Sequence, residues 1–146
     1  AALKSGKVKK YVVDFPDAET VNVPGIIAIP HLGASTEESE DNCAKMAADE
    51  IKEYLENGNI INSVNFPDCS IPNDKHSRVT VIHKNVPNVI ARYTDILKSV
   101  NISDMMNKSR GEYAYTIINT DHAVTQEMED ALRALDDVIA IRVFKN

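Results

Sequence analysis

Apolar and polar residues follow two periods along this chain, and the change from one to the other predicts its elements. In the second half, apolar residues recur at every second position and then at every third or fourth, as in strands and amphipathic helices. The elements expected there are a strand over 79–83, a helix over 88–99, strands over 102–109 and 112–120, a helix capped by Thr125 and a strand over 138–144. This β-α-β-β-α-β order predicts a ferredoxin-like fold with both helices on one face of the sheet. The other face and an edge strand are then open to pairing.

The first half has shorter apolar runs and one long amphipathic stretch. Two short strands and a helix are expected, at 10–14, 26–29 and 36–57. Ser35 and Glu38 have the spacing of a capping box at the start of the helix, and Gly58 provides its stop. The apolar face of this helix needs partners, so we expect that the first half cannot bury itself alone.

A loop separates the two halves. Proline, serine, asparagine and aspartate gather over 67–75, which is the composition of a connection rather than of a helix or strand. We therefore expect one domain over 1–72 and a second over 73–146.

Composition narrows the class of protein. The 146 residues are 43% hydrophobic and 26% charged, and the net charge of −6 argues against a nucleic-acid surface. Neither a membrane-length apolar run nor a signal peptide is visible, so we expect no membrane partner and a cytoplasmic location. Cys43 and Cys69 are expected to be free thiols in a reducing compartment, and the four histidines have no metal-ligand spacing, so no metal site is predicted.

The segment Pro30-His31-Leu32-Gly33-Ala34-Ser35-Thr36 carries the strongest chemical signal. It places a histidine between a short apolar strand and the start of a long helix. A histidine in such a position is suited to proton transfer near neutral pH. The alternative on spacing alone is a loop histidine that caps the turn.

Several segments, in one collinear order, resemble the D-2-hydroxyacid dehydrogenases. Residues 29–36 match the family's Pro-His-x-Gly-(Ala/Gly)-Ser-Thr segment, and 4–8 with 11–16 look like the last strand of its nucleotide-binding domain. Residues 64–67 are similar to the linker that leads to its regulatory domain. Residues 82–85 and 100–102 look like an ACT domain of the serine-sensing kind.

The resemblance implies an α/β protein in which the tail end of a Rossmann-type dehydrogenase domain precedes a C-terminal ACT domain. The chain begins at Ala1 without a methionine and has no Gly-x-Gly-x-x-Gly loop. We therefore expect the C-terminal part of a longer NAD-dependent oxidoreductase, in the branch of the family that serves L-serine biosynthesis. The fragment itself is expected to be inactive and to bind no NAD.

Site residues follow from the same resemblance. It implies that His31 is the general acid, and that Asp14, His31, Leu32, Gly33 and Ala34 lie at the nicotinamide. The alternative for Asp14 is an acceptor of N–H groups at a strand end. The carboxylate partner of His31 is left unassigned, although Asp17 and Glu19 are near in sequence.

An effector site is implied in the ACT domain. His83, Asn85 and Asn101 match the family's L-serine contacts, with Asn101 supplied by a neighbouring subunit of a homo-oligomer. The alternative is that both asparagines are ordinary turn residues. Asn88 stands where the family usually has glycine, which puts effector affinity in doubt.

Two other functions remain open. The chain could be an amino-acid-sensing ACT module that binds and assembles, or part of a dehydrogenase for another 2-hydroxy acid. In the favoured interpretation the partners are a small-molecule substrate, an amino-acid effector and further copies of the chain.

Overall fold

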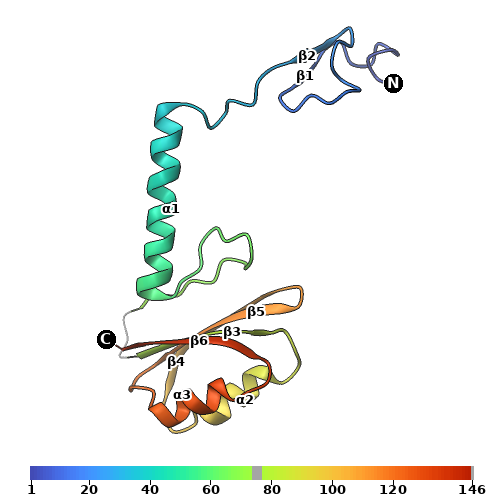
Figure 1. The fold of residues 1–146 in the computed structure, drawn as a ribbon. Coiled ribbons are helices and arrows are strands. Elements are labelled where there is room, and N and C mark those ends of the chain that lie inside the picture. Colours follow the sequence, from blue (N-terminus) through green and yellow to red (C-terminus); the bar gives the residue numbers. More distant parts are fainter. Residues whose placement is uncertain (74–76, 146) are drawn as a thin grey trace. The chain divides into compact units, whose positions relative to one another are not determined.

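The computed structural model describes residues 1–73 and 77–145. It comprises two compact units, Ala1–Lys45 and a second that starts at Met46. In the first unit, β1 (Tyr11–Val13) and β2 (Ile26–Ala28) pair in parallel, with Tyr11 opposite Ile26. Helix α1 (Glu37–Asn57) begins in this unit and ends in the second (Figure 1). The three elements lie where the apolar pattern predicts them.

The capping residue of α1 is Thr36 rather than the predicted Ser35. The Thr36 hydroxyl accepts from the Ser39 N–H at 3.2 Å, and the Thr36 carbonyl accepts from the Glu40 N–H at 2.9 Å. The Ser35 N–H instead donates to the Leu32 carbonyl at 3.0 Å, which makes Ser35 part of the preceding turn. Both residue types favour this position, so local turn geometry decides between them.

The second unit has the predicted ferredoxin-like topology. Its elements are β3 (Ser77–Lys84), α2 (Val89–Ile96), β4 (Ile102–Arg110), β5 (Tyr113–Thr120), α3 (Gln126–Arg133) and β6 (Val138–Lys145). The strand order is β4-β5-β3-β6, and all neighbours are antiparallel. Thr125 caps α3, as predicted, by accepting from the Met128 N–H.

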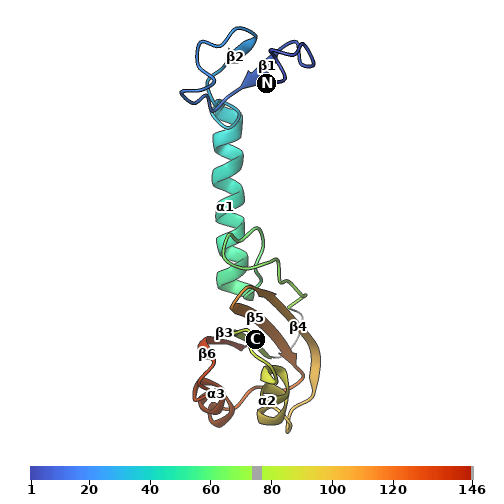
Figure 2. The same cartoon turned by 90° about the vertical axis from the view of Figure 1, so that its right-hand side faces the viewer.

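Both helices of this unit cover one face of the sheet, as Figures 1 and 2 show. The core between them is apolar because alternate residues of each strand point to this side. Its buried members are Val79, Val81, Val89, Tyr93, Leu97, Ile118, Val124, Leu132 and Ile141.

The second face of the sheet is also covered, which corrects the prediction that it lies open. Residues 58–73 fold back over it, and Ile60 pairs with Cys69 in an isolated antiparallel bridge. Ile60 and Cys69 form a buried cluster with Tyr115 and Ile117 of β5. Residues 114–120 are accordingly all buried. The packed unit therefore begins before the predicted boundary at 72/73, in the middle of α1.

Candidate functional site

His31 and Asp14 meet just beyond the carboxyl ends of two parallel strands. Asp14 follows β1 directly, and His31 lies three residues after β2. Because parallel strands end at the same edge of a sheet, the pairing of β1 with β2 brings the two side chains together. His31 Nδ1 lies 2.7 Å from Asp14 Oδ2, and the Phe15 ring lies 4.4 Å from the imidazole, centroid to centroid.

This geometry suits the histidine to proton exchange. An ionised carboxylate only accepts hydrogen bonds, so the contact with Asp14 places a proton on Nδ1. It also orients the ring and leaves Nε2 for a substrate oxygen. The His31 and Asp14 side chains are 53% and 51% exposed, so a ligand can reach them.

The two other acids considered from the sequence take part in a local turn. Asp17 Oδ1 accepts from the backbone N–H of Glu19 at 3.1 Å and of Thr20 at 3.0 Å. The hydrogen bond from the Thr20 hydroxyl lowers the pKa of Asp17. The partner that sequence reasoning left unassigned is thus Asp14. Its position at the end of the strand parallel to β2 is the signal that could have identified it.

The residues after His31 are exposed to solvent. Leu32 is 59% exposed, and a Cβ added at Gly33 would meet no atom within 4 Å. Nothing in the packing of this segment therefore requires glycine, and the open space suits the close approach of a flat ring. The residues present fit the nicotinamide end of NAD, whereas the sequence holds no Gly-x-Gly-x-x-Gly segment for its pyrophosphate.

His83 lies inside the second unit. Its Nδ1 is 2.9 Å from the Lys84 carbonyl oxygen, and its Nε2 is 2.8 Å from the Thr116 hydroxyl. The Tyr93 ring of α2 meets the imidazole edge-on at 5.4 Å. The histidine is fully buried and both ring nitrogens have partners within the fold.

Asn85 and Asn101 lie at opposite ends of the sheet. Asn85 Nδ2 donates to the Gly111 carbonyl at 3.1 Å, and Asn101 Nδ2 donates to Asp121 Oδ2 at 2.6 Å. Strands β3 and β4 flank β5 and run parallel to each other. The Asn85 N–H donates to the Glu112 carbonyl and the Asn101 carbonyl accepts from the Asp121 N–H, so the two asparagines are separated by the length of β5, about 30 Å. One chain does not bring them together.

A surface cavity of about 440 Å³ adjoins Asn85 and is lined by Lys84, Asn85, Val86, Glu112 and Tyr113. Asn88 nearby has φ 66°, the left-handed conformation that glycine adopts readily. Asparagine therefore keeps the backbone of this loop in the conformation that a glycine would allow.

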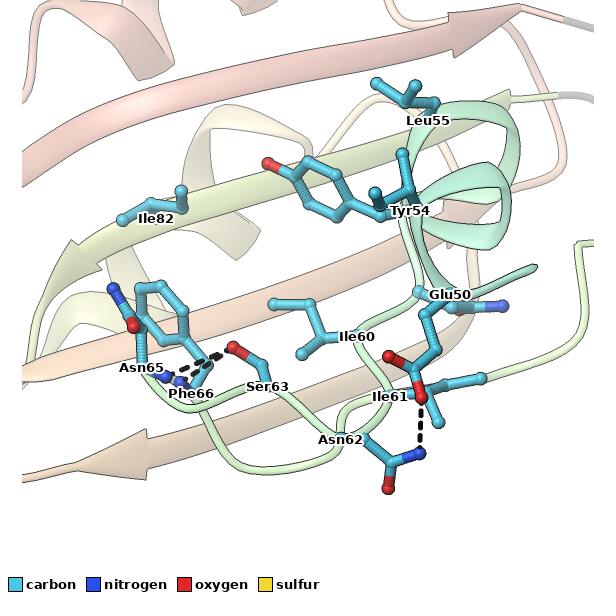
Figure 3. Close-up of a pocket in the computed structure, with 12 residues that line it drawn as sticks. Glu50, Tyr54, Leu55, Ile60, Ile61, Asn62, Ser63, Asn65, Phe66 and Ile82 are labelled. Atoms are coloured by element: carbon cyan, nitrogen blue, oxygen red, sulfur yellow. Dashed lines mark hydrogen bonds between the residues drawn. The ribbon is translucent and has the colours of Figure 1, made fainter. Parts of the chain in front are cut away.

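A second cavity, which sequence reasoning missed, lies on the other face of the sheet. It has a volume of about 370 Å³ between the end of α1, residues 59–66 and Ile82 of β3. Figure 3 shows Tyr54, Ile60 and Phe66 around it, with the Glu50 carboxylate accepting from Asn62 Nδ2 at 2.7 Å. Among residues 1–73 and 77–145, no group of three or more potential metal ligands occurs.

Comparison with known proteins gives sequence relatives but no match to any family model. D-3-phosphoglycerate dehydrogenase 2 of Saccharomyces cerevisiae is 34% identical over 128 residues, which cover 84% of this chain and 27% of that protein. The D-3-phosphoglycerate dehydrogenase of Dictyostelium discoideum is 29% identical and covers 97% of this chain, which spans 38% of it. That of Escherichia coli K12 is 29% identical, with coverages of 81% and 30%.

Among solved structures, the ligand-free regulatory subunit of aspartate kinase from Thermus thermophilus is 14% identical, with a TM-score of 0.34. The match covers 51% of this chain and 55% of that one.

The chain thus spans 27–38% of the length of these three curated relatives. No helix in the described part of the chain is long and apolar enough to cross a membrane. By sequence, this chain is a homologue of part of the D-3-phosphoglycerate dehydrogenases.

Proposed function

We propose that this chain works as part of an NAD-dependent D-3-phosphoglycerate dehydrogenase of L-serine biosynthesis in the cytoplasm, with His31 as general acid and base. The observation that carries the proposal is the 2.7 Å contact between His31 Nδ1 and Asp14 Oδ2, within a segment that resembles the dehydrogenase family. The homology to these enzymes over most of the chain supports the same conclusion.

In this proposal His31 Nε2 takes the proton of the substrate hydroxyl, or returns it in the reverse direction. Asp14 acts through His31: it holds the ring and stabilises the imidazolium that forms. When bound, NAD accepts or supplies the hydride. The second oxygen of Asp14, together with Leu32, Gly33 and Ala34, would hold the nicotinamide. Because the sequence holds no loop for the pyrophosphate, we expect the 146 residues alone to be inactive.

The test is substitution in a full-length enzyme that contains this sequence. His31→Asn is expected to lower the rate of NADH formation by about 10²–10⁴-fold, the usual effect of removing a general acid. Asp14→Asn should lower it as well, because the neutral amide has no charge with which to stabilise the imidazolium that forms on His31. Asp17→Asn is the matched control, since Asp17 belongs to the local turn. A His31→Asn enzyme with the parental rate would show that His31 is only a loop residue.

We also propose that the second unit pairs with another copy and binds an amino-acid effector, L-serine, at the seam. Two observations support this proposal. A cavity lies beside Asn85, and Asn101 of the same chain is too far away to reach it, so a site that uses both asparagines needs two copies of the chain. A ligand that binds only the pair stabilises it by mass action, by about 2.7 kcal/mol at a hundredfold excess over its dissociation constant.

Sedimentation should show a dimer at micromolar concentration, and calorimetry should show serine binding that Asn85→Ala or Asn101→Ala abolishes. Asn42→Ala, at an exposed asparagine of α1 in the first unit, is the control. A dimer that gives no heat with serine would mean that this unit serves assembly only.

A further inference from the structure

Phe15 is an exposed aromatic residue that lies against the imidazole of His31. The two ring centroids are 4.4 Å apart, and the ring planes are tilted by 37°. Phe15 is 73% exposed, and neither of the two buried apolar clusters among the described residues includes it. Burial in a core therefore does not account for the position of this ring beside the histidine.

The backbone on both sides of Phe15 is constrained. Strand β1 ends at Val13, two residues before it. Pro16 follows it directly, and a residue before proline is restricted to extended conformations. The chain then enters the local turn of Asp17, whose Oδ1 accepts from the Thr20 hydroxyl at 2.7 Å while its N–H donates to that hydroxyl at 2.8 Å. The Phe15 ring is thus presented to the histidine from a short, fixed segment.

A single hydrogen bond leaves the orientation of the imidazole incompletely defined. Asp14 Oδ2 lies 2.7 Å from Nδ1 and so holds one edge of the His31 ring. The ring can still turn about the line that joins these two atoms, and this turn changes the direction in which Nε2 points. A contact with the face of the ring opposes the turn. Such control matters because a small misplacement of a reacting group costs rate.

We propose that Phe15 is a positioning residue for the proton transfer: it holds the His31 imidazole by its face, while Asp14 holds it by its edge. This inference rests on the proposed function, in which His31 Nε2 exchanges the proton of the substrate hydroxyl. In this role Phe15 acts through the histidine and touches neither the substrate nor the cofactor.

The kinetic test uses a full-length enzyme that contains this sequence. Phe15→Leu keeps an apolar side chain but loses the flat face, so kcat should fall about 2- to 10-fold, the usual contribution of a pair of stacked rings. The KM values for the substrate and for NAD should stay unchanged, because the ring contacts neither. Phe15→Tyr keeps the face and should restore the parental kcat.

Tyr11→Leu is the matched control. It removes another exposed aromatic side chain of the first unit, at the opposite end of β1 from Asp14. It should leave both kcat and KM at their parental values.

A second measurement needs neither activity nor cofactor. In NMR spectra of the 146-residue chain, nuclear Overhauser effects should connect the ring protons of Phe15 with those of His31. The ring current of Phe15 should also shift the His31 ring protons upfield of those of His122, an exposed histidine of the second unit. Phe15→Leu should remove this difference, whereas Tyr11→Leu should leave it.

The outcomes separate this inference from the proposed function. A loss of rate in His31→Asn but not in Phe15→Leu would overturn the positioning role and leave the proposed function standing. So would a raised KM for NAD at unchanged kcat in Phe15→Leu, since the ring would then belong to the cofactor site. Absence of the Overhauser effects between the two rings would show that the contact does not form. A parental rate in His31→Asn would overturn the proposed function itself, and this inference with it.

Discussion

Replacing Gly58 by alanine should destabilise the second unit more than any other glycine-to-alanine change in it. Two terms add at this position. A left-handed backbone with a Cβ costs about 1–2 kcal/mol. The new methyl group would also lie 2.7 Å from Thr80 Cγ2 and 2.8 Å from Phe144 Cε2. Overpacking of that kind costs about 1–3 kcal/mol, so the expected loss in unfolding free energy is ~2–5 kcal/mol.

Gly111 provides a matched control for the backbone term. It has φ +61°, and a Cβ there would meet no atom within 4 Å. Gly111→Ala should therefore cost only about 1–2 kcal/mol, the backbone term alone. Urea unfolding of both variants, followed by far-UV circular dichroism, gives the two free energies. Their difference measures how tightly the end of α1 is pressed against the sheet.

Equal losses for the two variants would refute the reasoning, because the contact term would then be zero. The m-values must also agree with that of the unsubstituted chain, since a changed m-value would mean that the substitution alters the compactness of either state.

Two further outcomes can be checked directly. Thr36→Ala should lower the stability of α1 by about 1 kcal/mol, whereas Ser35→Ala should have little effect. Amide exchange of the first turn of α1 measures both changes, and a larger loss of stability in Ser35→Ala would mean that Ser35 is the cap. At pH 8, a thiol reagent should modify exposed Cys43 but not Cys69 in the folded chain, because burial raises the pKa of Cys69 to about 11 and leaves little thiolate. Rapid modification of both cysteines before unfolding would contradict this.

The sequence predicted the regular elements well because their signals are local. Apolar and polar residues alternate over β3, and apolar residues recur at helical spacing over α2. Each pattern predicts the type of element and its buried face. The pairing of β1 with β2 is less local, and it was needed to place Asp14 beside His31. A sequence read along one strand at a time cannot show that two strand ends meet.

The cover on the second face was missed because residues 58–73 have no periodic pattern. Their contacts are long-range: Ile60 and Cys69 pack against Tyr115, and Arg78 donates to the carbonyls of Ile71 and Pro72. Sequence alone does not distinguish the buried Arg78 from an exposed charge at the start of a strand. The run over 114–120 was the available signal. Apolar residues alternate onto both faces of this strand, with Tyr115 and Ile117 on one face and Ala114 and Ile118 on the other, and such a pattern indicates a sheet covered on both faces.

The burial of Arg78 also limits where this chain can be cut into separate domains, and which segment recombination can transfer as a folded unit. Four acceptors of its hydrogen bonds, on Asn57, Asn59, Ile71 and Pro72, precede the loop at which the βαββαβ order begins. A chain cut after Pro72 would remove these four acceptors from a buried cation and uncover the apolar cluster around Tyr115. Recombination could move this sheet into another protein intact only by carrying the last turns of a helix with it.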